Sequence, residues 1–464
     1  MKRQVVLREL VPSVLVSTLA ATFGVALLQA TSNLAILISQ DDTTGSSGTV
    51  AMLLNIVALV FIVISVYVAA VVTANTFATV IVGRTRTIAL RRLIGATARQ
   101  ERRSVATEGI VVGLLGSAAG LVLGTALPAA GFGIGSATGA IPDASWDYLQ
   151  PVVLLPVVGV VLTTWLASWI GSRRVLTVSP MQATGATHDA SLAEVAGRRV
   201  RRAGSVVLFV LGTALLLFGI LVGFVTPLGV LIGLVGGILS FTGLVAGADI
   251  LMPPALRLVG RLLGRSAAGR LAAENAVRYP ERSSRTTIGL VIGVTLVTMF
   301  AVAMSTYARM IMLAQQQNPE VYQGVDTAMV VTLTVFSVLV GFSALIAGVG
   351  MVNNLSLSVL QRTRELGLLR ALGFTAGQLR QMILAEAAQL SVTAIAVGLV
   401  LGIGYGWAGA QSLLGSISGI VAPVVPGWLV AVVILAAAVL TAAASIAPTR
   451  RATRIAPVVA LAVE

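Results

Sequence analysis

Long apolar runs alternate with short polar segments along almost the whole chain. Most runs reach or exceed the roughly 20 residues that an α-helix needs to cross a membrane. This pattern predicts an all-α polytopic membrane protein with about ten transmembrane helices. The expected spans are residues 11–31, 51–82, 104–127, 151–171, 204–223, 227–250, 286–308, 327–357, 383–405 and 427–447.

Three features of these runs predict how the helices are built. The spans before and after Pro227 are separated by a very short connection, which favours a helical hairpin over a single re-entrant unit. Glycine-rich stretches at 113–124 and 233–243 predict faces for close helix packing. Residues 51–82 would form a helix of about 48 Å, against a hydrocarbon core of about 30 Å. The surplus there and in 327–357 is interpreted as a cytoplasmic stalk, with a tilted or bent helix as the alternative.

Basic residues fall almost entirely on one side of this map. If the N-terminus is cytoplasmic, 30 of the 31 basic residues lie on the inner side, and Arg309 is the exception. Such a bias sets the orientation of membrane proteins, so both termini are expected in the cytoplasm. The net charge of +14 then reflects topology and contact with anionic lipid, not nucleic-acid binding.

One basic segment occurs twice. Residues 84–102 (the first connector) and 362–380 (the second connector) are identical at ten of nineteen positions, at a constant offset of 278. Glu108 and Glu386 match at the same offset. Each connector sits between two predicted spans, so the repeat extends beyond it into the flanking helices.

The duplication predicts the domain organisation. Residues 1–186 and 275–464 form two repeats of four spans each, and 187–274 forms a linker with two additional spans. Six spans separate the start of one repeat from the start of the next, and six is even. The repeats should therefore have the same orientation and be related by a pseudo-twofold axis along the membrane normal.

The connectors have the pattern of a helix, a bend and a second helix. Gly95 and Gly373 permit the bend, and Thr97 and Thr375 are expected to cap the following helices. Apolar side chains beside the arginines could fill a groove on a partner, or pack on the membrane surface or on neighbouring helices; the duplication favours a docking role. In the second connector these are Leu366, Leu368, Leu369, Leu372 and Phe374.

Several chemistries are excluded by composition. A nucleotide-binding P-loop needs a lysine, and Lys2 is the only lysine in the chain. His188 is the only histidine and cysteine is absent, which argues against a metal centre and against a catalytic triad. The chain is therefore not expected to be an enzyme, and its energy source must be an ion gradient or a separate ATPase.

Three acids fall near the inner ends of predicted spans, namely Glu108, Glu386 and Asp249. Ionisable residues inside spans are functional candidates. Arginines are close in sequence to all three, so structural ion pairs are favoured, with a coupling or proton-relay role as the alternative.

RTRELGLLRALGFTAGQLR at 362–380, followed by a helix with Glu386, resembles the signature of the FtsX-like permeases. These are the membrane subunits of MacB-type, or type VII, ABC transporters. Residues 272–294 and 450–461 resemble the start and the end of that domain. The resemblance covers 275–464 well and 1–186 more loosely, as in a duplicated ten-span form.

The resemblance implies a bacterial plasma-membrane permease whose connectors are coupling helices seated on an ATPase. Two copies of a cytoplasmic ATPase subunit are expected to bind ATP and Mg²⁺, with no cofactor on this chain. The residues implied to make this contact are Arg86, Leu90, Arg92 and Gly95 in the first connector, and Glu365, Leu366, Gly367, Leu368, Arg370, Ala371, Leu372 and Gly373 in the second.

The expected activity is export or extraction of an amphiphile, such as a lipid, a peptide antibiotic or a hydrophobic drug. Many relatives carry a large extracytoplasmic domain between the first two spans of a repeat, but the corresponding loops here are short, at 31–50 and 309–326. An alternative is a mechanical signalling protein that acts on a cell-wall hydrolase or a sensor without transport. An ion-driven secondary transporter would need acids near the bilayer midplane, where the sequence has none.

Overall fold

Every regular element among the described residues is helical, which confirms the all-α class. The computed structural model describes residues 2–39, scattered positions from 52 to 74, 85–139, 150–172, 192–263, 274, 280–317, 319, 373–435 and 438. The labelled elements are α1 (Lys2–Ser39), α3 (Thr85–Leu93), α4 (Ala98–Ala137), the 3₁₀ turn η1 (Pro151–Val153), α5 (Leu154–Gly171), α6 (Leu192–Gly223), α7 (Gly229–Ala246), α8 (Ala248–Leu263), α10 (Pro280–Gln317) and α13 (Ala376–Ser418).

Seven of the described helices are long and apolar enough to cross a membrane. They correspond to seven of the ten expected spans. The other three, 51–82, 327–357 and 427–447, are not described over their whole length, so the stalk interpretation falls outside the described residues. Residues 427–435 are helical.

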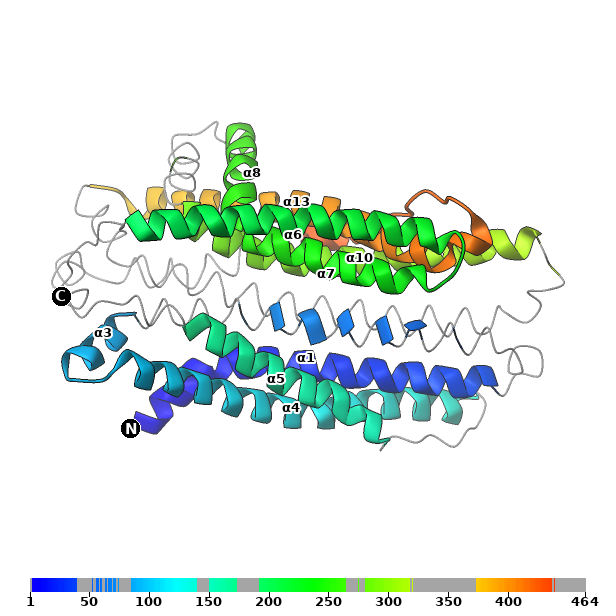
Figure 1. Cartoon of the computed structure of the whole chain (residues 1–464), viewed down its shortest axis with the longest axis horizontal. Coiled ribbons are helices and arrows are strands. Elements are labelled where there is room, and N and C mark those ends of the chain that lie inside the picture. The colour runs from blue at the N-terminus through cyan, green and yellow to red at the C-terminus, as the bar shows by residue number, and fades with distance from the viewer. Residues whose placement is uncertain are drawn as a thin grey trace.

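Some helix ends differ from the sequence-based bounds. α10 runs to Gln317 and α13 to Ser418, beyond the expected 308 and 405. α7 ends at Ala246 because Gly247 caps it, whereas the predicted span continued to residue 250. The segment that follows, for which the sequence predicted no further span, forms α8, which stands across the long axis of the bundle (Figure 1). Its inner face is held by Met252 and Leu256, both fully buried against the core.

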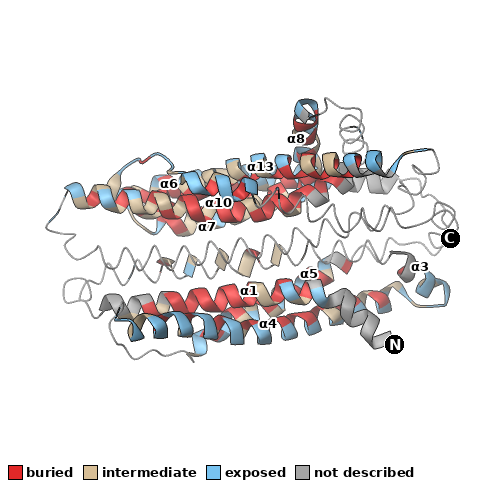
Figure 2. Cartoon of the chain, turned by 180° about the vertical axis from the view of Figure 1, so that it is seen from behind, coloured by how far each residue is buried: buried red, intermediate tan, exposed pale blue. Residues whose placement is uncertain are grey.

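The first helix of each repeat is the most buried. In the apolar stretches of α1 and α10, 78% and 72% of residues are buried, against 22–44% in the other candidate spans. Figure 2 shows the same contrast, with α4 and α5 exposing much of their outer faces. α1 and α10 are therefore equivalent central helices, and the described later helices pack on them, α4 and α5 on α1 and α13 on α10.

Glycines bring α4 onto α1, as their spacing predicted. A Cβ added to Gly116 would lie 2.5 Å from Ser17 Cβ, and one added to Gly124 would lie 2.7 Å from Val25 Cβ. In the second repeat, a Cβ on Gly398 of α13 would lie 2.7 Å from Val294 Cβ of α10. Gly120, which packs on α1, precedes Gly398 by 278 residues, so the two repeats use the same close-packing position.

The two-span insert is a helical hairpin, which confirms the favoured interpretation. α6 and α7 pack backbone to backbone, because a Cβ on Gly236 would meet the main chain of Leu216 and one on Gly243 would meet that of Phe209. The hairpin also packs on α13, where a Cβ on Gly223 would lie 2.6 Å from Ser412 Cα. The insert is thus attached to the second repeat.

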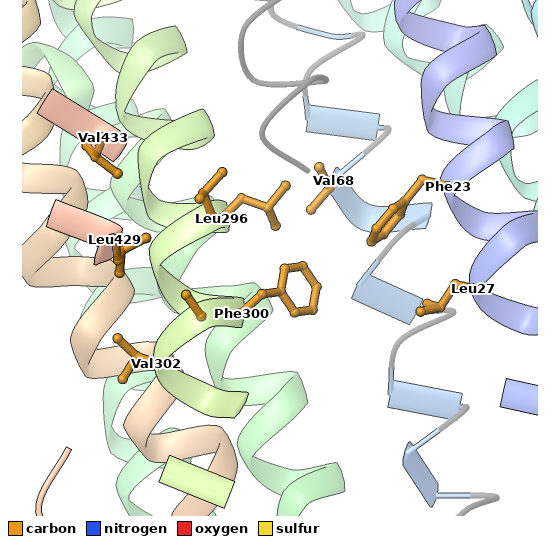
Figure 3. Close-up of a cluster of buried hydrophobic side chains, with 10 residues drawn as sticks. Phe23, Leu27, Val68, Leu296, Phe300, Val302, Leu429 and Val433 are labelled. Atoms are coloured by element: carbon orange, nitrogen blue, oxygen red, sulfur yellow. The ribbon is translucent and has the colours of Figure 1, made fainter. Parts of the chain in front are cut away.

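A narrow apolar seam joins the two repeats. Phe23 of α1 faces Phe300 of α10, with ring centroids 6.1 Å apart (Figure 3). Leu27, Val68 and Leu296 complete this part of the core. The described pieces of residues 52–74 run between α1 and the α6, α7, α10 and α13 group (Figure 1).

Candidate docking site

The first connector folds as a short helix, a tight turn and the start of a long helix. α3 ends in a Schellman motif, in which Ala96 N–H donates to Arg91 O at 3.0 Å and Gly95 N–H donates to Arg92 O at 3.1 Å. Gly95 has φ +108°, a value that an L side chain rarely adopts. The predicted glycine bend is therefore present, and it is fixed by the backbone.

Both connectors begin the next helix in the same way. Thr97 Oγ1 accepts from Gln100 N–H at 3.2 Å, and Gln100 Oε1 accepts from Thr97 N–H at 3.0 Å. Thr375 and Gln378 form the same capping box, at 3.2 and 3.0 Å. Gly373 precedes it with φ +97°. The predicted threonine caps are confirmed in both repeats.

α3 buries one face and exposes the other. Ile88 and Ala89 are buried, whereas Leu90, Leu93 and Ile94 are 46%, 53% and 87% exposed. Three neighbouring apolar side chains at the end of a bundle form a surface that another protein could cover. We call Leu90, Leu93 and Ile94 the α3 apolar surface. It lies at the end of the molecule where α1 and α6 begin (Figure 1).

Ile94 was not among the residues expected to make the contact, although the repeat could have identified it. Its partner at offset 278 is Leu372, which was expected in the second connector. Arg86 and Arg92 also lie in α3, as expected. Glu365, Leu366, Gly367, Leu368, Arg370, Ala371 and Leu372 lie outside the described residues, whereas Gly373 is exposed.

Two side chains of α4 hold the connector in place, and the sequence analysis missed both. Arg91 Nη1 lies 3.3 Å from Oε2 of Glu101, whose side chain is only 10% exposed. Glu101 is in the first turn of α4, where a negative charge is favoured by the helix dipole. Arg102 stacks over Trp169 at 4.0 Å from the ring centroid and donates from Nε to Ser172 Oγ at 3.3 Å. These contacts join α3 to α4, and α4 to the end of α5.

The three acids are not gathered into one site. Asp249 Oδ2 accepts from Arg201 and Arg202 of α6, both at 3.3 Å, rather than from a nearby arginine of α8. These two ion pairs fix the start of α8 to the first third of α6. Glu108 is half-buried in α4 and Glu386 is buried in α13, at equivalent positions of the two repeats. No cluster of three potential metal ligands occurs among the described residues.

The comparison with protein families matches this chain twice. The FtsX-like permease C-terminal family model covers residues 59–180 and 337–457. The two matches start 278 residues apart and end 277 apart, in agreement with the offset of the connectors. Together they span more than half of the chain. The chain belongs to the FtsX-like permease family.

A curated relative is consistent with this family. The chain is 34% identical over 100 residues to the "Uncharacterized ABC transporter permease YknZ" of Bacillus subtilis (strain 168). The aligned part is 22% of this chain and 24% of that protein, so it spans about a quarter of the relative's length. This FtsX-like permease is accordingly a membrane-spanning protein that is similar over part of its length to an ABC transporter permease.

Proposed function

We propose that this chain is the permease of an ABC transporter and that two cytoplasmic ATPase subunits dock on its two connectors. The partner binds ATP and Mg²⁺, and its closure moves the two repeats against each other to export or extract an amphiphile. The observation that supports this proposal best is the α3 apolar surface, which is exposed at one end of the bundle on a turn fixed by backbone hydrogen bonds.

Charge supports placing that surface in the cytoplasm. The same end of the molecule holds the start of α6, where Arg201 and Arg202 pair with Asp249. The first connector itself carries six arginines. Loops and helix ends rich in arginine face the cytoplasm in membrane proteins, which is also where an ATP-hydrolysing partner is found.

Contacts within the first repeat provide a route for force from the connector. α3 is tied to α4 through Arg91 and Glu101, and α4 is tied to α5 through Arg102 and Trp169. Gly116, Gly120 and Gly124, which are about one helical turn apart, bring α4 into close contact with α1. A push on α3 would therefore move α1, α4 and α5 together, and the apolar seam at Phe23 and Phe300 is where this group would slide on the second repeat.

The docking step is tested by co-purification of the full-length chain with its ATPase. Leu90→Asp, Leu368→Asp and the double variant are compared with Val200→Asp, a matched control at an exposed valine near the start of α6. Each single variant should lose one ATPase per permease, because a charge in an apolar contact is strongly unfavourable. The double variant should lose both. Membrane insertion should be unchanged throughout.

Unchanged ATPase stoichiometry in the double variant would refute docking at the connectors. The amphiphile is tested separately, in the reconstituted complex. Candidate lipids, peptide antibiotics and hydrophobic drugs should stimulate ATP hydrolysis and move across or out of the bilayer. If the ATPase docks but no amphiphile stimulates or moves, transport is refuted and force transmission to a membrane or extracellular partner is the better function.

A further inference from the structure

An apolar cavity lies where the first repeat, the insert and the second repeat meet. Its volume is about 120 Å³, and its walls come from Val60, Ile64, Tyr67 and Val68, from α6 and α7, and from α10 and α13. Val68 and Leu296, labelled in Figure 3, belong to it. The lining residues of α7, α10 and α13 fall inside stretches long enough to cross a membrane. The cavity therefore lies among helices that are long and apolar enough to cross a membrane.

One wall is a row of three aromatic rings, one from each part of the chain. Phe241 of the insert makes edge contacts with Tyr67 of the first repeat and Tyr405 of the second, at centroid distances of 6.4 and 6.0 Å. Tyr67 Oη lies 2.8 Å from Thr242 Oγ1, and Tyr405 Oη lies 2.8 Å from Ser240 Oγ. Both tyrosine hydroxyls are thus satisfied by α7, and the row links the two repeats through the insert.

The remaining polar groups are too few to hold ordered water. Ser412 Oγ donates to Gly409 O at 3.0 Å. Among the described lining residues, Thr295 Oγ1 is the one buried side-chain oxygen without a hydrogen-bond partner. A buried water needs roughly two to four polar partners, and apolar cavities of about 150 Å³ stay dry and take benzene-sized molecules. A short hydrocarbon segment fits this cavity better than water does.

We infer that this cavity binds the hydrocarbon chain of an amphiphile, which enters from the surrounding bilayer. Its place between the repeats means that a relative movement of the repeats changes its walls, because Tyr67 and Tyr405 belong to different repeats. The statement that the bound hydrocarbon chain belongs to the transported molecule rests on the proposed function. The binding of a hydrocarbon chain in the cavity does not depend on the proposed function.

Two glycines allow the cavity to be filled from its own wall. A Cβ on Gly409 would meet nothing within 4 Å, and one on Gly237 would lie 3.9 Å from Leu216 Cδ1, an ordinary contact. Gly409→Leu and Gly237→Leu should therefore occupy the space without disturbing the backbone. Gly404→Leu is the matched control. Gly404 is exposed on α13, the helix of Gly409; a Cβ added there also meets nothing within 4 Å, and Gly404 does not line the cavity.

The experiment uses the full-length permease in lipid nanodiscs, without ATPase. One arm contains a trace of phosphatidylcholine with a diazirine near the end of one acyl chain. The other contains a single-chain lysolipid with the same group. After illumination, labelled peptides are mapped by mass spectrometry. We expect labelling at the lining segments of α7 and α13, its loss in Gly409→Leu and Gly237→Leu, and its retention in Gly404→Leu.

The two arms distinguish the source of the chain. Labelling by phosphatidylcholine identifies a bilayer lipid as an occupant, and labelling by the lysolipid alone identifies a free amphiphile; both support the inference. If Gly409→Leu and Gly237→Leu are labelled as strongly as Gly404→Leu, the label comes only from the outer surface of the protein. That result would overturn the inference that the cavity binds a hydrocarbon chain.

Thr295→Val provides a second test with little change of volume. It removes the unpartnered hydroxyl, so labelling by a hydrocarbon chain should be unchanged or increased. A loss would show that the occupant is polar at this point. Because ATPase co-purification is measured independently, a failure of this site and a failure of the proposed function can be distinguished.

Discussion

Gly120→Ala should weaken the contact between α1 and α4, although alanine is the better helix former. The added Cβ would lie 2.9 Å from both Thr18 O and Thr22 N, and closer still to Ala21 Cβ. Optimal separations between carbon atoms are about 3.5–4.0 Å, so relieving the contact with Ala21 Cβ requires α1 to move by roughly 1–1.5 Å. The obstacle includes backbone atoms, which cannot rotate away as the end of a side chain can.

The size of the effect follows from two opposing terms. Overpacking of a close-packed contact costs about 1–3 kcal/mol. Replacing a helical glycine by alanine gains about 1 kcal/mol in helix propensity. We therefore expect Gly120→Ala to be destabilising by up to about 2 kcal/mol. Gly131→Ala on the same helix, where a Cβ meets nothing within 4 Å, should be neutral or stabilising.

The assay is thermal unfolding of the purified full-length chain in one detergent, followed by the fraction that stays monodisperse after heating. Gly120→Ala should unfold at a lower temperature than the wild type and Gly131→Ala should not. Gly398→Ala, the equivalent position of the second repeat, should behave like Gly120→Ala. Equal midpoints for Gly120→Ala and Gly131→Ala would refute the close contact between α1 and α4.

Three further variants test the ends of the helices. Gly95→Ala should strain the turn by about 1–2 kcal/mol, because its φ of +108° disfavours a side chain, and should weaken ATPase binding in a titration while Gly131→Ala binds normally. Glu101→Gln should cost less than about 1 kcal/mol of stability, because Arg91 is largely exposed, but should speed hydrogen exchange in α3; unchanged exchange would contradict the clamp. Asp249→Asn should free the start of α8, measured as faster proteolysis there, whereas an unchanged cleavage pattern would mean that packing alone holds it.

The repeat and its helices could be predicted because both depend on local patterns. Apolar runs identify spans by length, and the duplicated connectors fix the offset that the family matches later reproduce. The glycine bend and the threonine caps are similarly local, because Gly95 and Thr97 act within a few residues of themselves. The predicted glycine faces were correct for the same reason, since a helix without side chains on one face can be approached closely.

The contacts that hold the connector could not be predicted in this way. Arg91 and Glu101 are ten residues apart and meet only because the turn folds α3 back on α4. Arg102 and Trp169 meet because α4 and α5 pack side by side. α8 was missed because its sequence resembles a basic connection, and only burial of Met252 and Leu256 against α10 and α13 makes it a stable helix.

The two connectors share the glycine bend and the helix cap but differ in the charged residues around them. The capping boxes and the glycine bends are the same in both. At offset 278, however, Arg91 and Glu101 are replaced by Leu369 and Leu379, and Thr87 by Glu365. Duplication has therefore kept the glycine bend and the helix cap of both connectors, while the charge at equivalent positions has diverged, so two ATPase subunits docked on the connectors would meet different surfaces.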